Sequence, residues 1–130
     1  MSVGVLLVTH EGIGTALIAV ATQLMPALPL RVEALEVPFA GDPDALLPQA
    51  SAALRRVDRG DGVLVLTDLY GATPSNLAAK LARLGTPVRR VSGLSLPMLL
   101  RVMNYAELEL DELPAVAAAG ARNGVVRDDA

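Results

Sequence analysis

Short, continuously apolar runs alternate along this chain with longer segments in which apolar residues recur every three to four positions. The short runs predict buried strands over residues 3–8, 30–37, 63–66 and 88–91. The longer segments predict helices over residues 15–25, 43–60, 73–84, 97–103 and 111–122. Such alternation is typical of a doubly wound α/β fold, with a mostly parallel sheet of four to five strands and helices on both faces. Val125-Val126 is predicted to close the sheet as an antiparallel edge strand.

Capping residues set the expected boundaries of the helices. Asp42-Pro43 and Thr73-Pro74 each combine an N-cap residue with a proline in the first helical turn. Gly85 is expected to end the third helix, and Asp111 is expected to cap the last one. No internal repeat, linker or low-complexity tail divides the sequence, so we expect a single domain over residues 1–130.

Composition narrows the classes of function. Hydrophobic residues make up 52% of the 130 residues and aromatic residues only 2%, so Ala, Leu and Val must fill the core. A net charge of −3 without a basic stripe argues against nucleic acid as a partner. With no Cys and one His the chain offers no ligand set for a metal, and we expect no metal and no cofactor. The first apolar run is too short for a signal or a membrane span, so we expect a cytoplasmic protein without membrane insertion.

The candidate chemistry lies in three loops that follow the first, third and fourth predicted strands. These loops cover residues 9–12, 67–76 and 92–98. The carboxyl ends of parallel strands share one edge of a sheet, which is where open α/β sheets bind ligands. We therefore expect the three loops to meet, with His10 in the first and Asp68 in the second.

His10 and Asp68 suggest a nucleophile and the group that orients it. A neutral imidazole is available near pH 7, and a carboxylate bound to one ring nitrogen leaves the other free to attack. The stretch from Gly71 to Pro74 opens a helix, whose N-terminal amides attract anions such as phosphate. Each feature also has a purely structural interpretation, because His10 can pack or cap a turn, Asp68 can be a turn residue, and Thr73 can simply cap the helix.

Four segments resemble the IIA domain of the mannose/sorbose class of bacterial sugar phosphotransferase systems, and the resemblance covers essentially the whole chain. Val5-Leu-Leu-Val-Thr-His10 is similar to the first strand and phosphorylated histidine of that family. Gly62-Val-Leu-Val-Leu-Thr-Asp68 is similar to its third strand and acidic partner. Tyr70-Gly-Ala-Thr-Pro74 resembles its aromatic-Gly-Gly-Ser-Pro loop, and Gly93-Leu-Ser-Leu-Pro-Met-Leu99 its Gly-Val-Asn-x-Pro-Met-Leu segment.

The resemblance implies a phosphotransferase component that carries phosphohistidine. His10 would accept a phosphoryl group from the carrier HPr, with Asp68 bonding one imidazole nitrogen, and pass it to a separate IIB protein or act as a regulatory phospho-sensor. The phosphoryl oxygens would be bound by the loop residues Gly71, Ala72 and Thr73. An apolar rim for docking of partner proteins would comprise Leu69, Tyr70, Leu96, Pro97 and Met98. The resemblance also implies a homodimer in which the strand at Val125 and Val126 pairs across subunits.

Two departures from the family pattern bear on the site. Leu69 stands where many relatives carry Thr, so a side-chain hydrogen bond made there by relatives is missing here, and Ser95 replaces an Asn. Two alternative functions remain open from the sequence. One is the phosphocarrier subunit of a phosphotransferase-dependent dihydroxyacetone kinase, which neighbouring genes would reveal. The other is a non-catalytic regulatory module in which His10 only recognises an anion.

Overall fold

Strands and helices alternate along the chain in the computed structural model, which describes residues 2–129. The strands are β1 (Gly4–His10), β2 (Val32–Val37), β3 (Val63–Thr67) and β4 (Val88–Ser92). The helices are α1 (Gly14–Leu24), α2 (Pro43–Val57), α3 (Thr73–Leu81), α4 (Leu96–Met103) and α5 (Leu113–Asn123). A single turn of 3-10 helix, η1 (Leu110–Glu112), precedes α5. The predicted order of elements is therefore confirmed, with shifts of a few residues at their ends.

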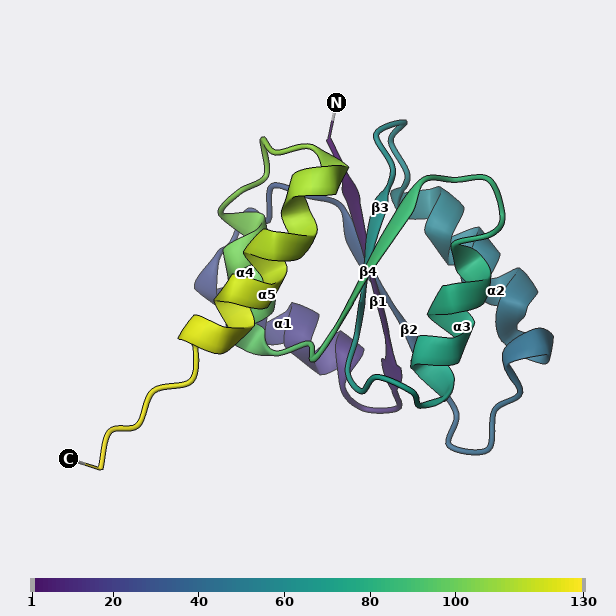
Figure 1. Ribbon diagram of the computed structural model, residues 1–130, viewed down its shortest axis with the longest axis horizontal. Helices are drawn as coiled ribbons and strands as arrows, with labels where there is room; N and C mark the ends of the chain where they lie inside the picture. The colour runs from purple at the N-terminus through teal and green to yellow at the C-terminus, as the bar shows by residue number, and fades with distance from the viewer. Residues whose placement is uncertain (1, 130) are drawn as a thin grey trace.

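The four strands formed by residues 2–129 are all parallel and lie in the order β2-β1-β3-β4. Helices α1, α4 and α5 cover one face of this sheet, and α2 and α3 cover the other (Figure 1). The chain leaves β1 toward one face and leaves the neighbouring strand β3 toward the other face. This reversal makes the carboxyl ends of β1 and β3 a topological switch point, the place where such sheets bind ligands.

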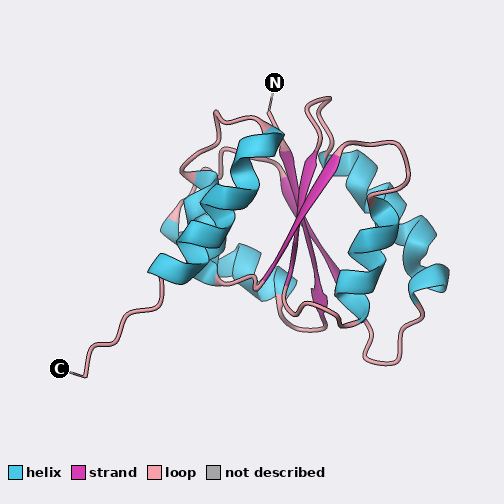
Figure 2. Cartoon of the chain, viewed as in Figure 1, coloured by secondary structure: helices cyan, strands magenta, loops and turns pink. Residues whose placement is uncertain are grey.

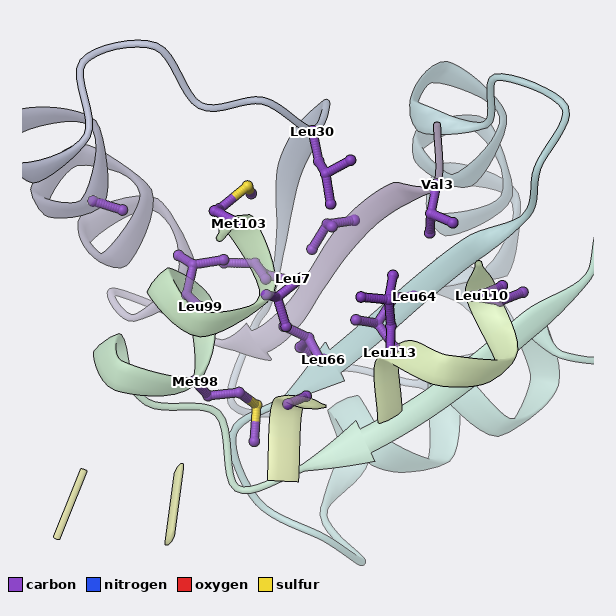
Figure 3. Close-up of a cluster of buried hydrophobic side chains, with 14 residues drawn as sticks. Val3, Leu7, Leu30, Leu64, Leu66, Met98, Leu99, Met103, Leu110 and Leu113 are labelled. Atoms are coloured by element: carbon purple, nitrogen blue, oxygen red, sulfur yellow. The ribbon is translucent and has the colours of Figure 1, made fainter. Parts of the chain in front are cut away.

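The central strands are apolar on both faces because helices cover both. On one face, Leu7, Leu64 and Leu66 pack with α4 and α5 side chains such as Leu99 and Leu113, and all five are fully buried (Figure 3). A second cluster fills the space between the sheet and helices α2 and α3, and it includes Leu6, Val8, Val63, Val65, Leu54 and Leu77. A strand buried on both faces appears in sequence as a continuous apolar run, which is why β1 and β3 were predictable.

The predicted closing strand at Val125 and Val126 is wrong for the single chain. Residues 125–129 form no strand, and the two valines are 77% and 74% exposed. The tail leaves the end of α5 and runs away from the sheet (Figure 2), so it meets no strand of its own chain that could accept its backbone hydrogen bonds. The sheet of the described chain accordingly ends at β4.

The start of the last helix also differs from the prediction. Asp111 does not cap α5, because it lies inside the preceding 3-10 turn and its carboxylate binds Arg89 of β4 at 2.7 Å. Glu109 and Glu112 form a capping box at this turn instead. None of the helices formed by residues 2–129 combines the length and apolar character needed to cross a bilayer.

Candidate functional site

His10 and Asp68 meet at the switch point between β1 and β3. His10 is the last residue of β1, and Asp68 directly follows the last residue of β3. Their pairing follows from the register, in which Val8 lies opposite Thr67, so the next residues of both strands leave the sheet side by side. The His10 side chain is 30% exposed and the Asp68 side chain 10%, so the imidazole reaches solvent over a nearly buried carboxylate.

The carboxylate of Asp68 holds His10 at two points through one oxygen. Its Oδ2 lies 2.7 Å from Nδ1 of the imidazole and also accepts the backbone N–H of His10 at 3.2 Å. The other oxygen, Oδ1, is buried and has no hydrogen-bond partner among residues 2–129. Since an ionised carboxylate can only accept hydrogen bonds, this contact assigns the ring proton to Nδ1. Nε2 is then left with its lone pair, as a nucleophile requires.

The first turn of α3, which begins five residues after Asp68, has backbone N–H groups that no side chain in the described part of the chain caps. Gly71 has a φ of +87°, a conformation that side chains disfavour, and it turns the chain from β3 into the helix. Ala72 is the N-cap and supplies no side-chain hydrogen bond, while Thr73 is the first helical residue. Ordinary capping by the Thr73 hydroxyl, one of the two interpretations of the sequence, is therefore not what the structure has.

The amides at this helix end are not equivalent. The Ala72 N–H donates to the carbonyl of Leu69 in a long bond of 3.4 Å, and Pro74 has no N–H. The amides of Thr73 and Ser75 donate to no carbonyl or side chain of residues 2–129. Free amides at a helix N-terminus form an anion site together with the helix dipole. The predicted donor Thr73 is thus available, whereas the Ala72 amide must first give up a weak turn bond.

The five residues of the predicted docking rim differ in their exposure to solvent. Leu69 and Tyr70 are 59% and 84% exposed, and Pro97 is also exposed, whereas Leu96 is half-buried. Met98 is only 1% exposed and belongs to the core between α4 and the sheet, so its predicted contact with a partner is wrong. Met98 turns inward because it lies in the first turn of α4, where its N–H donates to the N-capping hydroxyl of Ser95 at 3.2 Å.

Two residues that the sequence did not single out hold the loop after His10. The carboxylate of Glu36, on β2, accepts the amides of Gly12 and Thr15 at 3.0 Å each. Buried Thr9 accepts the amide of Gly14 at 3.0 Å and donates to the carbonyl of His10 at 2.8 Å. A charged residue near the carboxyl end of a predicted strand was the signal that could have pointed to Glu36.

Phe39 is a third residue that the sequence did not single out. Its side chain is 92% exposed, and it follows β2, the strand beside β1 opposite to β3. The strand order therefore places Phe39 and Tyr70 in the loops on either side of the one that carries His10. Large apolar side chains exposed together around a reactive group are typical of a surface for protein partners.

Comparisons of this chain with known proteins found a matching family and several relatives. A family model described as EIIA-man, PTS system fructose IIA component, matches residues 4–118. The transcriptional regulatory protein LevR of Bacillus subtilis (strain 168) is 28% identical over 116 residues, which cover 83% of this chain and 12% of that protein. The PTS system mannose-specific EIIAB component of Escherichia coli (strain K12) is 30% identical over 84 residues, or 63% of this chain and 26% of that protein. This chain thus spans only a small part of both relatives.

Solved structures show the same fold. The mannose/sorbose specific IIA subunit of the phosphotransferase system from Enterococcus faecalis superposes with a TM-score of 0.87 at 22% identity, covering 100% of this chain and 97% of that chain. A sigma-54 interaction domain protein from the same organism superposes with a TM-score of 0.77 at 16% identity, covering 95% and 93%. With the family model matched over residues 4–118, the chain belongs to the EIIA-man family, the mannose-class IIA components of the phosphotransferase system.

Proposed function

We propose that this protein carries a phosphoryl group on Nε2 of His10, taking it from phosphohistidine of HPr and passing it to a separate IIB protein. The observation that supports this most directly is the 2.7 Å contact between Nδ1 of His10 and Asp68. A proton on Nδ1 leaves Nε2 unprotonated, on a side chain that is 30% exposed. As the bond from Nε2 to phosphorus forms, the bond from phosphorus to the donor imidazole breaks, and the donor nitrogen recovers its electron pair.

The protein's contribution to this transfer is position and charge. Phosphoryl transfer passes through a loose, in-line transition state in which negative charge spreads over three equatorial oxygens. The free amides of Thr73 and Ser75 and the Thr73 hydroxyl are donors for those oxygens, and the α3 dipole adds to their attraction. Asp68 meanwhile stabilises positive charge on the imidazole that bears the phosphoryl group. His10, Asp68 and the first turn of α3 thereby have distinct roles.

The direct test is transfer of label from phosphoenolpyruvate through enzyme I and HPr. We expect one acid-labile phosphoryl group per chain in the wild-type protein and none in His10→Ala. Label that persists in His10→Ala would contradict the assignment of His10, and a wild-type protein that stays unlabelled would contradict the whole proposal. Chase of the label onto a purified IIB protein tests the second transfer.

Asp68→Asn tests the tautomer argument separately. The amide group of Asn can donate a hydrogen bond to Nδ1, which moves the ring proton to Nε2 and removes the attacking lone pair. We expect the transfer rate to fall by roughly 10⁴-fold, because a wrongly set tautomer has an effect of this order in other histidine-dependent enzymes. Nitrogen NMR of the imidazole checks which nitrogen carries the proton, and a wild-type pattern with a normal rate would contradict the role of Asp68.

A regulatory destination for the phosphoryl group is the second candidate function. The match to LevR, described as a transcriptional regulatory protein, covers 83% of this chain and motivates it. Phosphorylation of His10 would then report the state of the phosphotransferase system instead of driving sugar uptake. Both functions require the first transfer from HPr, and they separate at the second one. A phosphorylated protein that is discharged by no IIB protein but binds a partner in only one phosphorylation state would favour regulation.

We further propose that two copies associate through the C-terminal tail and β4. No strand formed by residues 2–129 lies on the outer edge of β4, and the exposed Val125 and Val126 need a partner for their apolar surface. Asp128 and Asp129 follow these valines, and exposed Arg90 of β4 offers the opposite charge. A groove of about 590 Å³ along β4 and α3 gives the incoming side chains room.

Light scattering should show a dimer that deletion of residues 124–130 converts to a monomer, and a monomeric full chain would contradict the pairing.

A further inference from the structure

The loop between β1 and α1 is held by a carboxylate that comes from a different strand. Glu36 of β2 lies opposite Thr9 in the register, one position before the pair formed by Val37 and His10. From there its Oε1 accepts the Gly12 amide and its Oε2 accepts the Thr15 amide, each at 3.0 Å. One side chain thus binds both the turn that follows His10 and the first turn of α1.

We propose that Glu36 is a positioning residue for His10, holding the loop after β1 so that Nε2 keeps the direction needed for phosphoryl transfer. This inference rests on the proposed function, because it assigns a residue to the support of the same reaction. Glu36 does not act on the phosphoryl group itself. It acts through the backbone of residues 12–15, which is joined to His10 by the single residue Glu11.

The loop needs such support because its own sequence provides little. Gly12 has a φ of +86°, and a Cβ added there would meet no atom within 4 Å. Glycine also loses more conformational freedom on folding than any other residue type, so this turn is costly to order. Ile13 is the N-cap of α1 and has no side chain able to cap. The Ile13 amide makes only a long bond of 3.4 Å to the His10 carbonyl. The two bonds to Glu36 are charge-assisted and therefore among the stronger ones available to the loop.

Support from two sides defines the imidazole's direction. Asp68, which follows β3, holds the His10 ring and backbone from one neighbouring strand, while Glu36 holds the following loop from the other neighbour, β2. Loss of Glu36 leaves the Asp68 contact intact but lets the loop move, and the chain can then rotate about the end of β1. A displacement of about 1 Å in a reacting group can cost up to 100-fold in rate, so even partial loosening should be measurable.

Glu36 has a second consequence for anions. Its carboxylate occupies the N-terminus of α1, which begins four residues after His10, where a free phosphate would otherwise bind the same amides. The chain therefore keeps its own negative charge at one helix end next to His10 and leaves the α3 end for the phosphoryl group. Without Glu36, inorganic phosphate should bind at α1 and interfere with the approach of the phosphorylated donor.

The experiment compares Glu36→Ala, Glu36→Gln and the matched control Glu33→Gln. Glu33 lies on the same strand and forms an ion pair with Arg56 at 2.9 Å, away from the loop after His10. We expect Glu36→Ala to lower the saturated rate of transfer from phosphorylated HPr by roughly tenfold, with little change in half-saturation. Glu36→Gln keeps one accepting oxygen and should fall in between, and Glu33→Gln should transfer at the wild-type rate.

Two further measurements separate positioning from general damage. Amide hydrogen exchange at Gly12 and Thr15 should accelerate in Glu36→Ala and stay unchanged in Glu33→Gln, and inorganic phosphate should inhibit Glu36→Ala more strongly than the wild type. A wild-type rate in Glu36→Ala, or an equal slowing in Glu33→Gln, would overturn the proposal. Unlabelled wild-type protein would instead contradict the proposed function, while unchanged amide exchange in Glu36→Ala would overturn the hold on the loop itself.

Discussion

The helices α1 and α3 both begin at the carboxyl edge of the sheet, α1 after β1 and α3 after β3. The amides at their N-termini nevertheless differ in whether they have hydrogen-bond acceptors. At α1, Glu36 and Thr9 accept the amides of Gly14 and Thr15 in the first turn and of Gly12 just before it. At α3, no side chain of the described residues caps the helix, and the Thr73 and Ser75 amides have no acceptor among those residues. Neither N-cap residue, Ile13 or Ala72, can cap with its own side chain. The difference therefore comes from the surroundings of each helix.

This contrast shows which helix end is available to a ligand. A missing N-cap interaction typically costs about 1 kcal/mol of stability, and Ser, Thr, Asn or Asp at residue 72 could recover it. The chain provides acceptors for the N-terminal amides of α1 and leaves those of α3 without them, which lowers the stability of the fold. That loss is understandable if a phosphoryl group completes the α3 end during the reaction cycle. The predictions below either remove the contrast or measure its size.

The largest effect is expected from closing the α3 end with a charge of its own. Ala72 has an extended backbone (φ −82°, ψ 174°), so Asp at this position can cap the helix as other N-cap residues do. Ala72→Asp should raise the unfolding free energy by about 1 kcal/mol and lower the transfer rate by roughly 10²- to 10³-fold, as loss of anion-stabilising donors does. Urea unfolding and label transfer measure the two effects.

Ala72→Asn serves as the uncharged companion to that change. It fills the same amides without repelling the phosphoryl group, so its transfer rate should lie between those of the wild type and Ala72→Asp. If Ala72→Asp transfers label as fast as the wild type, the free amides of α3 are not where the phosphoryl oxygens bind.

Removal of the Thr73 hydroxyl should have the next largest effect. Thr73→Val keeps the side-chain shape but loses one hydrogen bond to a charged group, worth about 1.5 kcal/mol or more, which corresponds to roughly a tenfold slower transfer. Thr73→Ser restores the hydroxyl and should recover most of the rate in the same single-turnover assay. Equal rates for Val and Ser at residue 73 would show that the backbone amides alone bind the oxygens.

The left-handed glycine before α3 can be compared with the left-handed glycine that follows this helix. Gly71 and Gly85 have φ values of +87° and +101°, and a Cβ at either position would meet no atom within 4 Å. Alanine in this left-handed region costs about 1–2 kcal/mol, so both Gly71→Ala and Gly85→Ala should lower the unfolding free energy by that amount. Only Gly71→Ala should also slow transfer, by a few-fold. A similar slowing in both variants would indicate a general effect of lost stability.

Acid should weaken the hydrogen bonds between Glu36 and the amides at the N-terminus of α1 before the fold is lost. Hydrogen bonds from the Gly12 and Thr15 amides hold the pKa of Glu36 below its ordinary value of 4.5. A lowered carboxyl pKa contributes stability above the unfolded-state pKa, and this contribution disappears as the pH falls through the folded-state value. The difference in unfolding free energy between the wild type and Glu36→Gln should thus be constant above about pH 4.5 and shrink below it. An unchanged difference down to about pH 3 would contradict ionic bonding by Glu36.

The sequence predicted the elements that depend on local patterns and missed those that depend on the partner of a side chain. Strands β1 and β3 were predictable because burial on both faces produces continuous apolar runs. The meeting of His10 with Asp68 followed from the rule that parallel strands end at one edge. The bonds of Glu36 were not predictable, because they depend on which residues of β1 and β2 lie opposite each other.

The errors have the same physical origin. Met98 was expected in the docking rim together with Leu96 and Pro97, but the helical turn from Ser95 directs its side chain into the core. The valines of the C-terminal tail have the composition of a strand, yet a strand forms only where another backbone accepts its hydrogen bonds. In both cases the residue type indicated an apolar contact, but the sequence did not show which residue would make that contact.

The exposure of the aromatic side chains makes the site optically accessible. The chain has no Trp, and its three aromatic residues are Phe39, Tyr70 and Tyr105, exposed by 92%, 84% and 40%. The core therefore contributes almost no ultraviolet absorbance or emission, and much of the tyrosine signal comes from the loop that follows Asp68. Docking of a partner at His10 should quench or shift the emission of Tyr70, so association can be followed with the unlabelled protein.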